Sequence, residues 1–332
     1  MAHPVLDQLL TANERFALNH RGTVNHLPMA LVALSHMGAD EARLKAYFNW
    51  WETNVALPRQ GLETPVAFAD WRTVQGQGAA FAPLAETFKA QIERVGCDRV
   101  VAEVAPELIG APSTLAFHAL IRLAYGQEAG HGGETGAGLA AWVTTYRDLD
   151  LRAGEKAAAG SVKSGLDAVA RAVGGREPLR GSITGALAAV AADPVFRDAV
   201  TAAPVLGERL LPELAQVALR LYWQFPNFTV LHMVTGLHAA RVLFERFPAL
   251  ATPAAIQALW GSWLAAYATV GAPVFEDAAV EGDARAWPDI FAAAIASDDD
   301  HVIKLTYSCA REGERYGDPA HQVVASRVAG LG

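Results

Sequence analysis

The sequence places a histidine and a lysine one helical turn apart, at His301 and Lys304. Residues three apart on an α-helix differ by about 60° and share one face. Three aspartates precede the pair, where the positive end of a helix favours acidic side chains, and apolar and aromatic residues follow it. We predict a capped, largely buried helix in which both side chains point inward. A buried lysine must lose its proton or find a carboxylate, and Asp300 and Glu312 are candidates for such a salt bridge.

Three further histidines, His26, His118 and His232, stand in the apolar parts of three other predicted helices. Imidazole is the commonest neutral ligand for iron, zinc, copper and nickel, and helical bundles build metal sites from facing helices. The residue types therefore favour a metal site. Helical spacing alone leaves open the alternative that each histidine is a hydrogen-bonded core residue. The sequence contains no His-Glu-x-x-His motif and no cysteine zinc site.

Two helices carry additional polar residues near these histidines. Arg122 and Tyr125 lie within about 60° of His118 on a helical wheel, and they would orient ligands or substrate if they face the site. The alternative is that they form a buried hydrogen-bonded pair. His238 lies about 120° from His232, so we expect only one of these two histidines to reach the site.

The composition indicates a globular protein with an extensive core, because 52% of its residues are hydrophobic and only 19% are charged. A net charge of −8 without a basic run argues against nucleic acid or an anionic membrane as the main partner. The two cysteines are far apart and make no disulfide framework. We expect a cytoplasmic protein, since a signal peptide is not recognised and the uncharged stretch 247–275 is interrupted by prolines and glycines.

In nearly every long segment the apolar residues recur at helical spacing. Alanine is abundant, and alternating runs of β-branched residues are scarce. We therefore predict an all-α fold, with residues 1–332 forming a single large multi-helix domain and the site between facing buried helices. Ser113 or Thr114 is expected to cap the helix that carries His118. Residues 130–138 are expected to form a flexible turn, because they lack the preceding strand and the glycine spacing of a nucleotide-binding loop.

Four segments resemble the questin oxidase-like family, in the family's order and across nearly the whole chain. They are Asn25-His26-Leu27, Phe117-His118-Ala-Leu-Ile-Arg122-Leu-Ala-Tyr125-Gly126, Leu231-His232-Met-Val-Thr235 and His301-Val-Ile-Lys304-Leu. The family includes enzymes that cleave an anthraquinone ring in polyketide pathways. The resemblance implies an all-helical oxygenase that acts on an aromatic small molecule with dioxygen.

The resemblance also implies a set of metal ligands. At least one family member is understood to hold non-haem iron with four histidines and a carboxylated lysine. Carried over to this chain, the ligands of Fe(II) are His26, His118, His232 and His301, together with Lys304 after it has added carbon dioxide. Burial and the iron cation would both favour the neutral amine that this addition requires. Other members have been described as Baeyer–Villiger-type oxidases that need NADPH, but this sequence has no flavin or dinucleotide fingerprint.

We therefore expect a non-haem iron oxygenase that acts on an aromatic polyketide, quinone or related polycyclic substrate, by oxidative ring cleavage or Baeyer–Villiger-type oxidation. The alternatives are an NADPH-assisted, metal-free oxidase of the same fold and a non-catalytic binding protein for hydrophobic aromatics. Many fungal relatives carry histidines where this chain has Pro28-Met29-Ala30, and Asp70 stands where an asparagine is expected. These departures concern the substrate more than the metal, and the sequence does not indicate the oligomeric state.

Overall fold

In the part of the chain that the structure describes, all regular secondary structure other than isolated β-bridges is helical. The computed structural model describes residues 4–20, 23–59, 64–153 and 160–332. Within these residues, β pairing is limited to two isolated bridges, Phe16 with Pro58 and Asn19 with Val24. The predicted all-α fold is confirmed.

Sixteen α-helices occur along the described residues. They are α1 Pro4–Asn13, α2 Leu27–His36, α3 Glu41–Asn54, α4 Phe81–Val95, α5 Cys97–Val104, α6 His118–Ala129, α7 Gly132–Thr144, α8 Val162–Val173, α9 Ile183–Ala191, α10 Pro194–Thr201, α11 Leu210–Gln224, α12 Phe228–Arg246, α13 Pro253–Thr269, α14 Trp287–Ala296, α15 Asp300–Tyr316 and α16 Ala320–Val328. Short 3-10 segments are η1 Phe68–Val74, η2 Gly78–Ala80, η3 Ala105–Glu107, η4 Gly207–Arg209 and η5 Pro248–Leu250.

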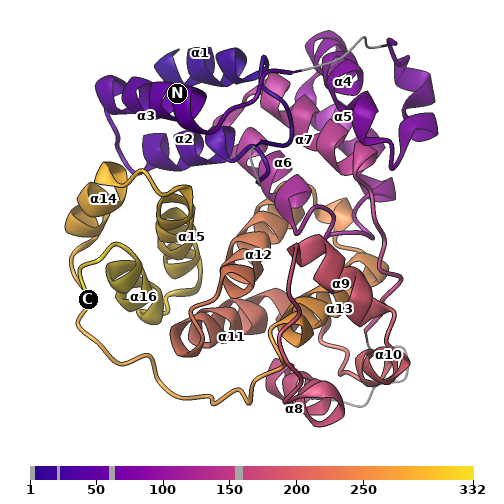
Figure 1. Cartoon of the computed structure of the whole chain (residues 1–332), viewed down its shortest axis with the longest axis vertical. Coiled ribbons are helices and arrows are strands. Elements are labelled where there is room, and N and C mark those ends of the chain that lie inside the picture. The colour runs from indigo at the N-terminus through magenta and orange to yellow at the C-terminus, as the bar shows by residue number, and fades with distance from the viewer. Residues whose placement is uncertain (1–3, 21–22, 60–63, 154–159) are drawn as a thin grey trace.

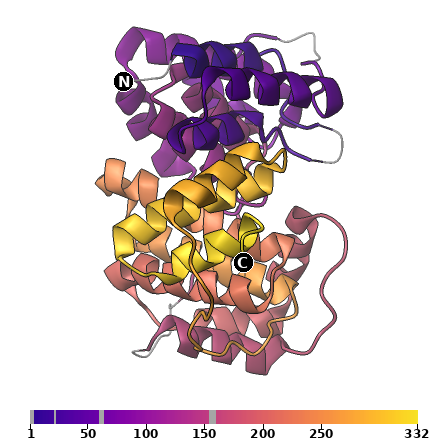
Figure 2. The ribbon, with the colours of Figure 1, turned by 90° about the vertical axis from the view of Figure 1, so that its left-hand side faces the viewer.

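The helices pack around one continuous hydrophobic core that includes residues from α1 through α16. Figure 2 shows the N-terminal helices at one end of the molecule, α8 to α10 at the other end, and the C-terminal helices between them. In Figure 1, α12 runs through the centre, with α15 on one side and α6 and α7 above it. This arrangement brings segments from both ends of the sequence to the same central region.

Four helices surround that region, namely α2, α6, α12 and α15. Helix α12 packs against both α6 and α15, and α2 packs against both of the same helices. Most side chains of α2 and α12 are buried around their whole circumference, as expected for helices in the middle of a large core. Polar side chains on these helices are therefore held inside the protein, where they need partners.

The glycine-rich segment after α6 is a buried helix, so the predicted flexible turn at 130–138 was wrong. Helix α7 packs against α6 over most of its length. A Cβ atom at Gly138 would lie 2.7 Å from Leu123 Cα, and one at Gly126 would lie 2.8 Å from the backbone nitrogen of Thr135. These glycines therefore allow two helix backbones to approach more closely than any larger residue permits.

Helix α13 lies in the uncharged stretch and is almost fully buried within the protein, as the sequence predicted. Among the described helices, none combines the length and the apolar character that crossing a membrane requires.

Candidate metal centre

The four histidines singled out in the sequence come together inside the protein, each at or near the N-terminal end of its helix. His26 directly precedes α2, His118 is the first residue of α6, and His301 is the second residue of α15. His232 lies in the second turn of α12. The His26 and His118 rings are stacked with centroids 4.6 Å apart, and the His118 and His232 centroids are also 4.6 Å apart.

Three of the imidazoles direct the same nitrogen toward one another. His118 Nε2 lies 2.7 Å from His26 Nε2 and 3.1 Å from His232 Nε2. The Nδ1 atoms of His118 and His232 each lie 2.7 Å from a backbone carbonyl oxygen, of Leu115 and Phe228 respectively. A carbonyl only accepts hydrogen bonds, so each Nδ1 carries the proton and each Nε2 presents a lone pair.

Burial keeps these three imidazoles neutral. It lowers the pKa of His26 to about 4 and, together with the neighbouring histidines, holds the pKa of His118 well below its usual value. Burial and the nearby Lys304 do the same for His232. Neutral rings whose lone pairs converge repel one another unless a cation lies between them. This donor set fits a transition metal.

The spacing of the nitrogen atoms supports the same conclusion. Metal–imidazole bonds of about 2.1 Å place adjacent nitrogens about 3.0 Å apart at a right angle and about 3.4 Å apart at a tetrahedral angle. The observed separations of 2.7 and 3.1 Å are close to the first value. Backbone carbonyls on the opposite ring nitrogens fix tautomer and orientation, which is the usual support of a metal-binding histidine.

A strained turn positions His118. Leu115, Ala116 and Phe117 have φ values of 55°, 54° and 68°, a left-handed conformation that side chains other than glycine rarely adopt. The turn points the carbonyl of Leu115 at His118 Nδ1. The prediction that Ser113 or Thr114 caps this helix was wrong, because the helix begins only after the turn. Such strain persists where the surrounding structure enforces it and is concentrated at functional sites.

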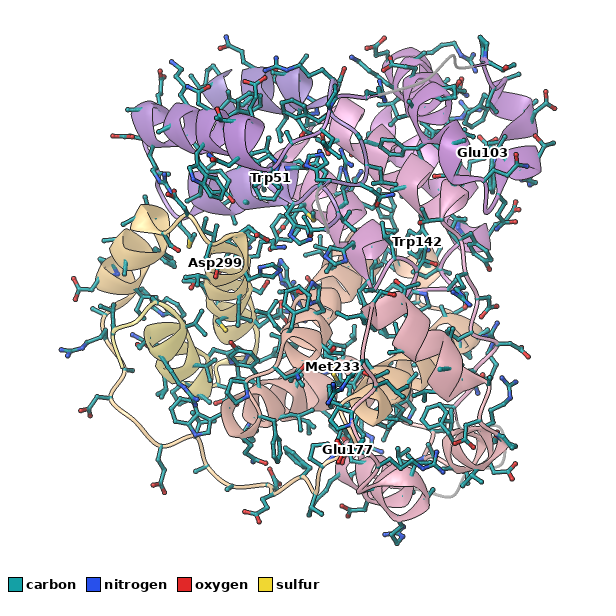
Figure 3. All side chains as sticks on the ribbon, viewed as in Figure 1. Trp51, Glu103, Trp142, Glu177, Met233 and Asp299 are labelled. Atoms are coloured by element: carbon teal, nitrogen blue, oxygen red, sulfur yellow. The ribbon has the colours of Figure 1, made fainter. Side chains whose placement is uncertain are left out.

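His301 and Phe228 complete the cluster on its outer side. The His301 ring lies 5.1 Å from that of His26 and 5.6 Å from that of His232, and its Nε2 is buried without a hydrogen-bond partner among the described residues. Phe228 is 52% exposed, with its ring 4.6 Å from His232 and 4.7 Å from His301. Figure 3 labels two residues of this region. The Trp51 ring is 6.3 Å from that of His26, and Asp299 directly precedes α15. Phe228 therefore lies between solvent and two of the histidines, His232 and His301, of which His301 is still partly exposed.

Lys304 is buried and reaches the histidines through Asp300. Its Nζ lies 2.9 Å from Asp300 Oδ2, which is also 2.6 Å from His26 Nδ1. Burial alone would raise the pKa of Asp300, but Lys304 and His26 hold it well below the usual value. The structure thus contains the salt bridge that the sequence offered as an alternative. Carboxylation of Lys304 stays a prediction.

Sequence reasoning named Asp300 only as a possible salt-bridge partner of Lys304 and missed its contact with the histidines. Its carboxylate, His26 and His301 form a second group whose potential ligand atoms lie within 4.8 Å of one another. The four-residue separation of Asp300 and Lys304 was a usable signal, because it places the two side chains on one helical face. The contact with His26 comes from a distant helix and has no local signal.

Arg122 and Tyr125 face other partners. Arg122 Nε lies 2.9 Å from Glu134 Oε2, and Asn13 Nδ2 donates to Glu134 Oε1 at 2.7 Å. The Tyr125 ring packs edge-on against His238, with centroids 5.9 Å apart. Within the described residues, no hydrogen bond or ion pair joins Arg122 or Tyr125 to the four histidines. Their proposed role with ligands or substrate is not supported by these contacts and stays a prediction.

His232 and His238 face different surroundings, as their positions on the helical wheel indicated. His238 Nδ1 lies 2.7 Å from Glu312 Oε1, and His238 Nε2 lies 3.5 Å from Glu128 Oε2. Burial alone would lower the pKa of His238, but the two carboxylates outweigh it and raise the pKa to about 9. An imidazolium in this position has no lone pair for a metal.

A comparison of the sequence with curated proteins gave no significant match. The family model described as questin oxidase-like matches residues 23–309, which include all four histidines, Asp300 and Lys304. This range covers most of the chain, from the residues before α2 to the middle of α15. The chain therefore belongs to the questin oxidase-like family.

Proposed function

We propose that this chain is a non-haem iron-dependent oxygenase that acts on an aromatic polyketide, quinone or related polycyclic compound. Family membership implies an oxidoreductase. The observation that supports a metal-dependent reaction is the convergence of three Nε2 atoms of neutral, buried imidazoles, with His118 Nε2 lying 2.7 Å from that of His26 and 3.1 Å from that of His232. Histidines that served as core residues or acid–base groups would present a donor to an acceptor instead.

In this proposal His26, His118, His232 and His301 hold the iron. Fe(II), when bound, would supply the chemistry that activates dioxygen, which protein side chains lack. The chain's own residues keep the imidazoles neutral, fix their tautomers through backbone carbonyls, and exclude water on the outer side through the ring of Phe228. The half-exposed Phe228 ring would be the first surface that a flat aromatic substrate meets.

The anionic oxygen that four neutral imidazoles lack has two candidate sources. One is a carbamate, formed when the neutral amine of Lys304 adds carbon dioxide and releases a proton. The other is Asp300, whose carboxylate already lies beside His26 and within reach of His301. A carbamate depends on bicarbonate and on the lysine side chain, whereas Asp300 depends on neither.

Metal analysis of protein purified without chelator tests the proposal. We expect about one iron per chain, and His118→Ala and His232→Ala should each lose most of it while circular dichroism shows an intact helical fold. His238→Ala is the matched control, from the same helix as His232, and it should retain the metal. Oxygen uptake with a hydroxyanthraquinone should follow iron content. Full activity in metal-free protein would favour an NADPH-assisted, metal-free oxidase, and binding without turnover would favour a sequestering protein.

A second measurement separates the two sources of the anionic oxygen. Iron affinity is measured with and without bicarbonate in the wild type, Lys304→Ala and Asp300→Asn. If the carbamate supplies the ligand, bicarbonate tightens iron binding in the wild type and has no effect in Lys304→Ala, which small carboxylates partly rescue. If affinity is independent of bicarbonate and Asp300→Asn loses the iron, carboxylation of Lys304 is wrong.

A further inference from the structure

A second polar cluster lies along the same four helices, away from the metal centre. His36 is ten residues beyond His26 and Glu128 is ten residues beyond His118, which at about 1.5 Å per helical residue places them about 15 Å further along. A surface pocket of about 510 Å³ opens beside this cluster. Its wall includes His36 from the end of α2, Trp287 and Phe291 from α14, and Tyr307 and Arg311 from α15.

Hydrogen bonds determine where the protons lie in this cluster. Tyr307 donates its hydroxyl proton to Glu128 Oε1 at 2.9 Å, and His36 Nδ1 lies 2.8 Å from the same hydroxyl oxygen. Burial alone would raise the pKa of Glu128, but His238 and Tyr307 hold it below the usual value, so Glu128 only accepts. The single hydroxyl hydrogen of Tyr307 is used in the hydrogen bond to Glu128. His36 Nδ1 must therefore carry the hydrogen that is donated to the Tyr307 oxygen.

This tautomer leaves His36 Nε2 as a hydrogen-bond acceptor in the wall of the pocket. Partial burial lowers the pKa of His36 below its usual value, which keeps the ring neutral near pH 7. Within the described residues, His36 Nε2 makes no hydrogen bond. The Tyr307–Glu128 pair fixes the orientation of the imidazole from behind, in the manner of the carboxylates that orient functional histidines.

Part of the pocket wall is aromatic. Trp287 and Phe291 lie one turn apart on α14, with ring centroids 5.5 Å apart and planes inclined by 37°. Both rings are only partly buried, so they present surface to the pocket. Arg311, which also lines the pocket, is paired with Glu314, whereas His36 Nε2 is an acceptor without a partner among the described residues. The volume lies within the range of small-molecule sites in proteins.

We propose that this pocket binds a planar hydroxyaromatic compound, whose ring packs on Trp287 and Phe291 and whose hydroxyl donates to His36 Nε2. The flat rings favour a fused aromatic system over an aliphatic chain. The acceptor selects a compound with a hydroxyl donor over its methyl ether, because burial would leave His36 Nε2 unsatisfied in the ether complex. The site is separate from the metal centre, so binding does not depend on iron.

Calorimetric titration of the full chain with 2-naphthol and with 2-methoxynaphthalene tests the proposal. These probes share a ring system and differ in the hydroxyl proton. The wild type should bind 2-naphthol about tenfold more tightly than the ether, which is the contribution of one buried hydrogen bond. His36→Ala should bind both probes equally, and Trp287→Ala should weaken both. Removing iron with a chelator should change neither dissociation constant.

Phe225→Ala is the matched control, since Phe225 is an exposed phenylalanine outside this pocket. It should leave 2-naphthol binding unchanged. Phe228→Ala distinguishes this pocket from the metal centre, because the Phe228 ring lies beside His232. If Phe228→Ala weakens 2-naphthol binding while Trp287→Ala does not, the compound binds at the metal centre and the proposal is wrong. Equal affinity of the wild type for the two probes would also overturn it, as would the absence of binding at millimolar concentrations.

Discussion

His238 gives a stability prediction whose sign and size follow from its surroundings. Its pKa is about 9 in the folded protein, against about 6.5 for an unperturbed histidine. Between these values the folded state holds a proton that the unfolded state has lost. The stabilisation is therefore complete below pH 6.5 and is lost as the pH rises through 9.

The magnitude follows from the difference between the two pKa values. Each unit corresponds to about 1.4 kcal/mol, so the contribution of His238 falls by on the order of 3 kcal/mol between pH 6 and pH 9. The carboxylates of both partners, Glu128 and Glu312, are largely buried. Solvent therefore screens their attraction to the His238 imidazolium only a little. A loss of this size is a large fraction of the stability of a typical domain.

Urea unfolding of the wild type and His238→Gln across this pH range measures the effect. The difference in unfolding free energy between the two proteins should shrink by on the order of 3 kcal/mol from pH 6 to pH 9. His321→Gln is the matched control. Burial lowers the pKa of His321, so its imidazole is neutral above pH 7 in both the folded and the unfolded protein. A wild-type advantage over His238→Gln that stays constant across the range would refute the assignment of an imidazolium to His238.

Two further substitutions test other parts of the central region. Arg122→Met leaves the Glu134 carboxylate buried without its charge partner, and should lower the free energy of unfolding by about 3 to 5 kcal/mol without loss of iron. A loss of iron with unchanged stability would instead support a role at the metal. Phe228→Ala should retain iron but raise KM for an aromatic substrate more than it lowers kcat, because the ring contacts two histidines and faces solvent. Unchanged kinetics would show that substrate does not contact this ring.

Helix α15 could be predicted from the sequence because its signals are local. Asp299 accepts a hydrogen bond from the backbone nitrogen of His301, as an acidic helix cap should. His301 and Lys304 then fall on the inner face through helical periodicity alone. The same reasoning separated His232 from His238. For these residues, position within one helix was sufficient, whereas for Arg122 and Tyr125, which share the face of His118, the partners come from other helices.

Features that depend on contacts between helices were not predictable in this way. The left-handed turn before His118 is formed by leucine, alanine and phenylalanine, whose types favour a continuing helix. Its stability comes from neighbours such as Gly236 on α12, where a Cβ atom would lie 3.1 Å from the Phe117 ring. The glycine-rich segment that forms α7 was predicted to be a flexible turn for a similar reason. The close approach of backbones that its glycines permit becomes visible only when α6 lies beside α7.

In the proposed iron site, the surrounding charges would connect iron binding with the chemical state of Lys304. The four histidines lie at or near helix N-termini, which carry a partial positive charge, and a dication there would add to that charge. Asp300 offsets Lys304, so this ion pair leaves little negative charge for the metal. Carboxylation turns one positive charge into a negative one and places it beside Asp300, where the two anions would repel each other without a cation. Iron and carbon dioxide should therefore bind cooperatively, each tightening the other, and a lysine that remained an ammonium would oppose the metal instead.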